Sequence, residues 1–311
     1  MTRRGLLTSA RCALGLCLAA SVLPSLSGAS GTEGASFLDI PVGGRPAALG
    51  GAYSALATDA YAPVWNAAGL GFLPSTQLSG MHVEYPASSA YEFASLVHPL
   101  GSGNGLGFAA QYFHLDQSTG RDANGNDIGS FTSHYGAYSL SFGHSFNKEF
   151  SLGAAVKLID ARIADVSARA VAADFGALYR PTERLAIAAV AANLGSKLTF
   201  LEQGDRLPQN YRLGAVYGLA KAVDVAAETA YDQTTLLSGR FGVEWRPAAA
   251  LALRAGYRTE TTSRLSAEAG LTTGFGLTVA GQRFDYAWLP LGDLGQTQYF
   301  SVVLSFGKGA K

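Results

Sequence analysis

The chain has 311 residues, of which 48% are hydrophobic, 15% charged and 11% aromatic, and its formal net charge is zero. So large a hydrophobic fraction excludes a disordered chain, and the balanced charge gives no indication of nucleic-acid binding. The 38 glycines and the low charged content also depart from an ordinary soluble domain.

Residues 1–29 are typical of a secretory signal peptide. Three arginines precede an apolar run over 12–23, which is too short for a spanning helix, and small residues at 27–29 form a cleavage site. Both cysteines, Cys12 and Cys17, lie in this leader. We therefore expect an exported mature chain without disulfides.

Residues 30–74 are predicted to form a plug rather than a strand. Leu49, Ala52, Tyr53 and Leu56 have the i, i+3, i+4, i+7 spacing of one helical face, which predicts a short helix. Asn66 then precedes a small-residue turn as a candidate N-cap. Such a small-sided element is suited to the lumen of a barrel.

From residue 75 to residue 306 the hydrophobic pattern has a period of two. Within 240–246, Phe241, Val243 and Trp245 share one face and charged or small residues share the other. No apolar run after the leader is long enough for a membrane helix, and segments of about ten residues suit a tilted transmembrane strand. Turn signals delimit fourteen such segments, near 75–84, 91–99, 104–114, 134–145, 150–160, 167–180, 184–194, 210–219, 222–231, 238–246, 250–258, 264–272, 275–285 and 296–306.

The predicted fold is therefore all-β, a transmembrane antiparallel β-barrel of about fourteen strands with a short helical N-terminal plug. Tight links alternate with long ones over 115–133, 195–209 and 286–295, which is the arrangement of outer-membrane barrels with periplasmic termini. A tail follows over 307–311. The alternative is a soluble fold, since the alanine-rich segment 184–195 would also suit a buried helix.

Ten charged residues are expected to face the lumen. Two interpretations are open: an ion-paired network that joins plug and wall, which we favour, or arginines that meet a carboxylate ligand. The residues are Lys157, Asp174, Arg212, Asp224, Glu228, Arg240, Glu244, Arg254, Arg258 and Glu268.

The sequence predicts no enzyme, no cofactor and no metal site. None of the five histidines has the spacing of a metal ligand, and adjacent strand residues such as His144 and Ser145 point to opposite faces. Oxygen-bearing residues over 122–127 have calcium-loop spacing but lack the closing glutamate, so a solvated loop is the preferred interpretation.

Two segments resemble the PorV/PorQ family of outer-membrane proteins, which are related to FadL-like transporters. The first is the plug motif, matched by Arg45, Leu49, Gly50, Gly51, Asp59, Trp65, Asn66, Gly69 and Leu70, with Ala67 where the family usually has proline. The second is a closing loop motif, matched by Asp285, Tyr286, Gly292, Asp293, Leu294 and Gly295, with Gln298 in place of histidine.

The resemblance implies a FadL-like barrel in the outer membrane of a Gram-negative cell, where it would handle or transport hydrophobic small molecules. The alternative that it implies is an accessory of the type IX secretion system that binds the C-terminal signal domains of exported proteins. The expected partners are outer-membrane lipid, the barrel-assembly machinery, and either an apolar ligand or such a signal domain. Individual ligand-binding residues are not predicted.

Overall fold

The structure is a computed structural model. It describes residues 33–86, 88–232, 236–259, 267–292 and 295–307, so the expected signal peptide lies outside the described residues. No helix among the described residues is long and apolar enough to cross a membrane.

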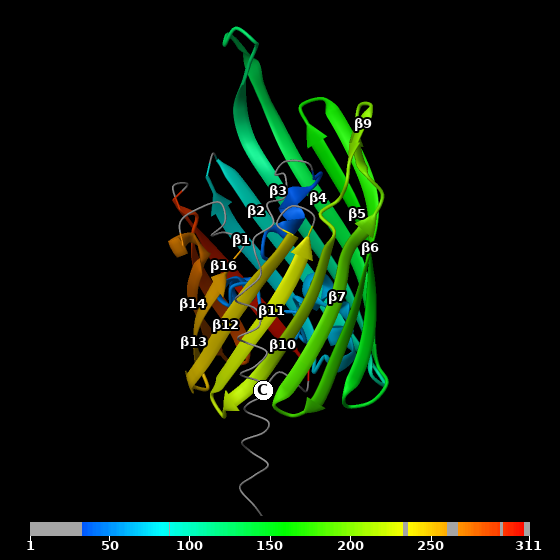
Figure 1. The fold of residues 1–311 in the computed structure, drawn as a ribbon, viewed down its shortest axis with the longest axis vertical. Helices are drawn as coiled ribbons and strands as arrows, with labels where there is room; N and C mark the ends of the chain where they lie inside the picture. The colour runs from blue at the N-terminus through cyan, green and yellow to red at the C-terminus, as the bar shows by residue number, and fades with distance from the viewer. Residues whose placement is uncertain (1–32, 87, 233–235, 260–266, 293–294, 308–311) are drawn as a thin grey trace, which may run out of the picture.

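Within the described residues, fourteen antiparallel strands form one closed barrel, as predicted (Figure 1). Neighbours in the barrel are neighbours in the chain, and β1 pairs with β16 to close the sheet. A separate hairpin, β8–β9, lies in the connection from β7 to β10. The barrel strands are β1 (Thr76–Tyr85), β2 (Ser89–Gly101), β3 (Asn104–Arg121), β4 (Asp127–Ser145), β5 (Phe150–Ile163), β6 (Val166–Thr182), β7 (Leu185–Gly195), β10 (Asn210–Ala220), β11 (Val223–Asp232), β12 (Leu236–Ala248), β13 (Leu251–Arg258), β14 (Leu271–Val279), β15 (Gln282–Pro290) and β16 (Gln296–Phe306), and the hairpin is β8 (Leu198–Phe200) and β9 (Gln203–Asp205).

Alternating side chains place apolar groups outside the barrel and polar groups inside. On β12, Phe241, Val243 and Trp245 are exposed, whereas Glu244 between them is only 3% exposed. Large apolar side chains are exposed on the outer face of every strand of the barrel, a surface that hydrocarbon solvates better than water. Closure leaves no strand edge unpaired, which a membrane-spanning sheet requires.

The two ends of the barrel differ in the length of their connections. At one end two- to four-residue turns join β4 to β5, β6 to β7, β10 to β11 and β12 to β13. At the other end, β3 and β4 rise above the remaining strands as one long hairpin (Figure 1). This asymmetry agrees only in part with the predicted short-turn and long-loop ends, because segment 115–133 is mostly paired strand and β5 joins β6 through two residues at the second end.

The strand prediction is wrong at two places near the C-terminus. The described part of segment 264–272 is mostly the 3-10 helix η4 (Ala267–Gly270), and only its last two residues belong to β14. Segment 275–285 instead contains the end of β14, a tight turn at Ala280 and Gly281, and the start of β15. Both turn residues have positive φ, and the two errors compensate in the total.

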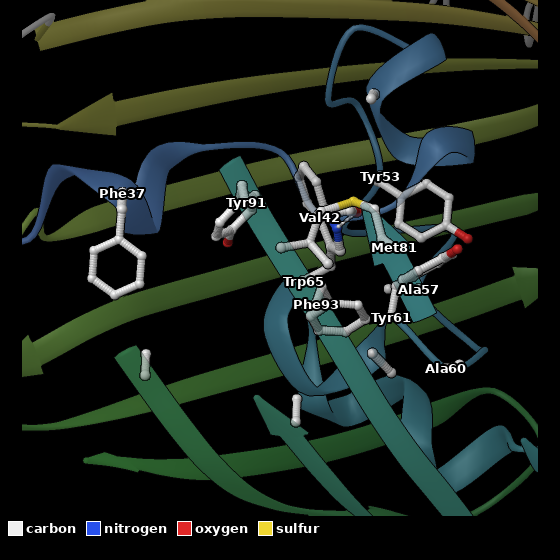
Figure 2. Packing of buried hydrophobic residues seen from close by; sticks show 14 of the residues in the cluster. Phe37, Val42, Tyr53, Ala57, Ala60, Tyr61, Trp65, Met81, Tyr91 and Phe93 are labelled. Carbon is white, nitrogen blue, oxygen red and sulfur yellow. Dashed lines mark hydrogen bonds between the residues drawn. The ribbon is translucent and has the colours of Figure 1, made fainter. Parts of the chain in front are cut away.

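The described part of the segment before β1, residues 33–75, lies inside the barrel, where it fills the lumen (Figure 1). It contains four short helical elements rather than one helix. These are η2 (Ser36–Asp39), α2 (Gly44–Ala48), α3 (Ala62–Trp65) and η3 (Ala67–Phe72). Figure 2 shows the aromatic side chains of this plug packed against Met81, Tyr91 and Phe93 of the wall.

Candidate functional site

The plug follows a tight path that the sequence predicts only in part. The helix expected over 49–56 does not form, because Gly50 and Gly51 have φ values of 64° and 78° and end α2 in left-handed backbone. The chain then turns until Pro63, at the start of α3. Gly50 also lies so close to the wall that a Cβ would overlap the backbone of Tyr257.

Two motif residues of the plug, Arg45 and Asp59, belong to a ring of alternating charges with the wall. Arg45 donates two hydrogen bonds to Glu244, from Nε at 2.8 Å and from Nη2 at 3.0 Å. The ring runs from Arg45 to Glu244 (2.8 Å), Arg254 (2.7 Å), Asp285 (2.8 Å), Arg283 (2.8 Å), Asp59 (2.8 Å) and back to Arg45 (3.8 Å). It joins the plug to β12, β13 and β15.

Tyr53 connects the two plug members of the ring. Its hydroxyl donates to Asp59 Oδ2 at 2.6 Å and accepts from Arg45 Nη1 at 3.2 Å. Burial alone would lower the pKa of Arg45, but the attraction of Glu244 outweighs burial and raises that pKa above its ordinary value. Inside the barrel each charge of the ring therefore depends on its neighbours for solvation.

Asn66 forms the predicted N-cap and also fastens the plug to the wall. Its Oδ1 accepts from the Ala68 N–H at 3.1 Å, which begins η3. Its Nδ2 donates to the Ser54 carbonyl within the plug and to the Ala177 carbonyl of β6. The neighbouring Trp65 donates from Nε1 to the Val42 carbonyl at 2.9 Å.

The remaining plug motif residues are buried at close contacts. Leu49 and Leu70 are 1% and 0% exposed. A Cβ at Gly69 would overlap the Ala57 carbonyl, so only glycine allows the plug to pass over itself there. The motif thus specifies how the plug folds and where it touches the wall.

The closing motif is divided by the structure, and its prediction as a single loop is wrong. Asp285 lies on β15, 4% exposed, as a member of the charge ring, and Tyr286 points outward from the same strand. Gly292 and Gly295 lie in the turn before β16 with positive φ. Asp293 and Leu294 lie outside the described residues.

The lumen-facing charges largely pair, as the favoured interpretation predicts. Lys157 contacts Asp174 at 2.7 Å, Arg246 contacts Asp224 at 2.7 Å, and Arg240 lies 3.6 Å from Glu228. Glu228 also accepts from the Ser54 N–H of the plug. Glu268 is an exception, because it is exposed on η4 outside the strands.

A small cavity of about 40 Å³ remains between the plug and the wall beside η2. Four basic side chains line it, Lys157, Arg212, Arg240 and Arg258, together with Asp39 of the plug. The Asp39 side chain keeps solvent-accessible surface at this cavity but is surrounded by the barrel. Removal from bulk water, followed by the charges of Glu33 and Asp232, raises its pKa to about 7.

A lumen-facing arc of aromatic side chains covers the opposite wall. Consecutive register partners across β4, β3, β2, β1 and β16 are Tyr135, Phe113, Tyr91, Val83 and Tyr299. Phe37 of the plug packs against this aromatic arc, with its ring 5.8 Å from that of Tyr135. The lumen beside the plug therefore has one aromatic wall and one basic wall.

A protein-family model matches more than half of the chain. The matching family is the Uncharacterised protein family (UPF0164), and the match covers residues 25–197. The chain belongs to UPF0164. No curated protein sequence matches it.

Solved structures similar to this UPF0164 chain include a hydrocarbon channel, a toluene transporter and a FadL homologue. The CymD monoaromatic hydrocarbon channel aligns with a TM-score of 0.64 and 14% identity over 87% of this chain and 99% of that chain. The toluene transporter TbuX of Ralstonia pickettii aligns with a TM-score of 0.62 and 14% identity over 85% of this chain and 98% of that chain. A FadL homologue of Pseudomonas aeruginosa aligns with a TM-score of 0.55 and 13% identity over 85% of this chain and 98% of that chain. At these identities the comparison shows a shared FadL/TodX-type fold.

Sequence reasoning missed one member of the charge ring in this UPF0164 chain. Arg283 was not among the expected lumen charges, because 275–285 was predicted as a single strand. Had β15 been recognised, the signal was available: Arg283 and Asp285 are two residues apart and so share one face of a strand.

Proposed function

We propose that this UPF0164 chain is an outer-membrane barrel of the PorV/PorQ type that transports hydrophobic small molecules. Residues 1–29 are its cleavable signal peptide, 30–74 its plug, 75–306 its barrel and 307–311 its tail. The short-turn end faces the periplasm and the β3–β4 hairpin faces outward. The lipid of the outer membrane surrounds the barrel, and the barrel-assembly machinery inserts it.

The aromatic arc is the observation that carries this proposal. Tyr135, Phe113, Tyr91 and Tyr299 line the lumen side of adjacent strands, where an ordinary porin has a polar wall. Phe113 and Tyr135 are only partly buried and so keep apolar surface available. Aromatic side chains bind apolar solutes through large contact areas and ring stacking.

The structural comparison supports the same class of solute. CymD is a monoaromatic hydrocarbon channel and TbuX a toluene transporter, and both have the fold of this chain. The plug motif supports the PorV/PorQ relationship, since its residues make the plug–wall contacts described above. The alternative role as a type IX secretion accessory finds no support among these structures, and we do not propose it.

Uptake of toluene by cells that carry the protein as their only such channel tests the proposal. Replacing Phe113 by glutamine should lower the uptake rate severalfold, because a polar group then interrupts the aromatic arc. Phe131→Gln is the matched control. Phe131 lies on the part of the β3–β4 hairpin that extends past the ends of β2 and β5, outside the aromatic arc, so its replacement should leave uptake unchanged. Equal uptake with and without the wild-type protein would refute the function.

A further inference from the structure

A second and larger cavity lies at the short-turn end of the barrel. Its volume is about 360 Å³, and it lies between the plug and the inner wall of β6, β7, β10, β11 and β12. Residues of the β6–β7 and β10–β11 turns form its rim. The aromatic arc belongs to other strands, so this cavity is a separate feature from the proposed hydrocarbon site.

Basic side chains outnumber acidic ones around this cavity. The basic lining residues are Arg180, Arg184, Lys221 and Arg246, and the acidic lining residues are Glu183 and Asp224. Arg246 already contacts Asp224 at 2.7 Å and Glu244 at 2.6 Å. Among the described residues, no ion pair is formed by Arg180, Arg184 or Lys221, so their charges are available to a ligand.

The floor of the cavity is apolar. Leu56 of the plug, Ala186 of β7 and Val216 of β10 line it. The Arg180 guanidinium lies 3.5 Å from the ring centroid of Phe72, which holds this cation against the plug instead of leaving it free in solvent. A cavity with an apolar floor and a cationic rim excludes water from one side of a bound ligand, which isolated lysines on solvated turns do not do.

We propose that this cavity is a binding site for a small organic acid in its anionic form. The carboxylate would be bound by Arg184 and Lys221 at the rim, with Arg180 nearby, and the apolar body would rest on Leu56 and Val216. The volume fits a small molecule rather than a folded partner. The site depends on neither the aromatic arc nor hydrocarbon transport.

Binding of benzoate to the full-length protein in lipid nanodiscs, measured by calorimetry, tests this proposal. Benzyl alcohol is the matched uncharged probe. We expect benzoate to bind more tightly than benzyl alcohol, and 0.5 M salt, at a screening length of about 4 Å, to weaken benzoate binding alone. Arg184→Gln combined with Lys221→Gln should weaken benzoate binding by about fivefold, the effect of losing two partly exposed charges.

Lys148→Gln is the control variant, because Lys148 is an exposed turn lysine at the same end that does not line the cavity. It should bind benzoate as the wild type does. Heat-modifiable gel mobility confirms that each variant is folded. Undetectable benzoate binding, equal affinity for the two probes, or an unchanged affinity in the double variant would each overturn the proposal, whatever the result of the toluene uptake test.

Discussion

At the scale of single residues, Arg45 carries a charge that has little contact with water, because its side chain lies inside the barrel. Its side chain is 15% exposed, and Glu244, its partner, is 3% exposed. Arg169 offers a direct contrast, since it contacts Asp160 at 2.7 Å on the outside of the barrel with 79% exposure. The shortest N–O distances of the two pairs are similar, and the pairs differ in solvation.

Replacing Arg45 by methionine should therefore lower the free energy of unfolding by about 3–5 kcal/mol, because it leaves the Glu244 and Asp59 carboxylates short of a buried partner. Arg169→Met should change that free energy by only about 0–1 kcal/mol. Urea titration of the detergent-solubilised protein measures both values. If the free energy of unfolding changed by a similar amount in the two variants, burial would not be what makes the Arg45 ion pair important for stability.

Asp39 makes a second residue-scale prediction, in which pH is the variable. The ordinary pKa of aspartate is 3.8, and burial with the neighbouring Glu33 raises that of Asp39 to about 7. Between these values the folded state binds the proton and the unfolded state does not, so this group's contribution to stability falls as pH rises from about 4 to 7. The loss is complete about one pH unit above the folded-state pKa.

Asp39→Asn should remove this part of the pH dependence. The comparison is the free energy of unfolding of the wild type minus that of the variant, measured from pH 4 to pH 8, which cancels the titration of the histidines. Asp127→Asn, at an exposed position on the β3–β4 hairpin, is the control. A difference that stays constant with pH for Asp39→Asn would contradict the raised pKa.

At the scale of elements, the backbone of the turn from Asn66 into η3 is compatible with the proline that the PorV/PorQ motif usually carries. Ala67 is the first residue of η3, its N–H makes no hydrogen bond among the described residues, and Asn66 before it is extended, with ψ of 101°. Residues before proline favour that conformation. Ala68 differs, because its N–H donates to Asn66 Oδ1.

Ala67→Pro should therefore raise the free energy of unfolding by about 0.4–1 kcal/mol, since proline reduces the freedom of the unfolded chain. Ala68→Pro should lower it, because that substitution removes the cap hydrogen bond. Urea titration distinguishes the two. Destabilisation of similar size in both variants would mean that the wall, rather than the backbone, limits what this turn accepts.

The elements also show how far the sequence can predict this fold. Alternation located the barrel strands from β1 to β13, because outward apolar residues recur at every second position, as on β12. It did not predict the β8–β9 hairpin, which lies within the expected link 195–209. It failed over 264–285, where Gly274 and Gly276 carry no side chain to mark a face and the β14–β15 turn has only two residues. The prediction of a helix over 49–56 was wrong because hydrophobic periodicity does not show which glycines adopt left-handed backbone.

The candidate site was predictable to a similar degree. The two motifs identified Arg45, Asp59 and Asp285 separately, and the structure brings them into one ring with Glu244 and Arg254. Partners in a closed barrel are set by strand register, and one sequence contains no direct record of register across distant strands. Period-two alternation therefore predicted which charges face inward but not which of them meet.

At the scale of the whole molecule, the wall holds the plug from several sides at once. Asn66 contacts β6 and Arg45 contacts β12, while Ser151 of β5 donates to the Ala68 carbonyl and Ser95 of β2 donates to the Ala60 carbonyl. These strands lie around much of the barrel circumference (Figure 1). Loss of one anchor leaves the others, so the plug should remain in place after any single substitution.

This arrangement predicts non-additive effects on ion conductance in planar bilayers. Arg45→Met and Asn66→Ala should each leave the conductance near the low value of the plugged wild type. The combined variant should raise it severalfold, because the plug then loses its contacts with β6 and β12 together and can move within the lumen. Heat-modifiable mobility should persist in all three variants, since the fourteen strand pairs join wall to wall. If the combined variant conducts no better than the single ones, the remaining anchors, which include those on β2, β5, β11 and β15, are sufficient to hold the plug, and solutes must pass around it in place.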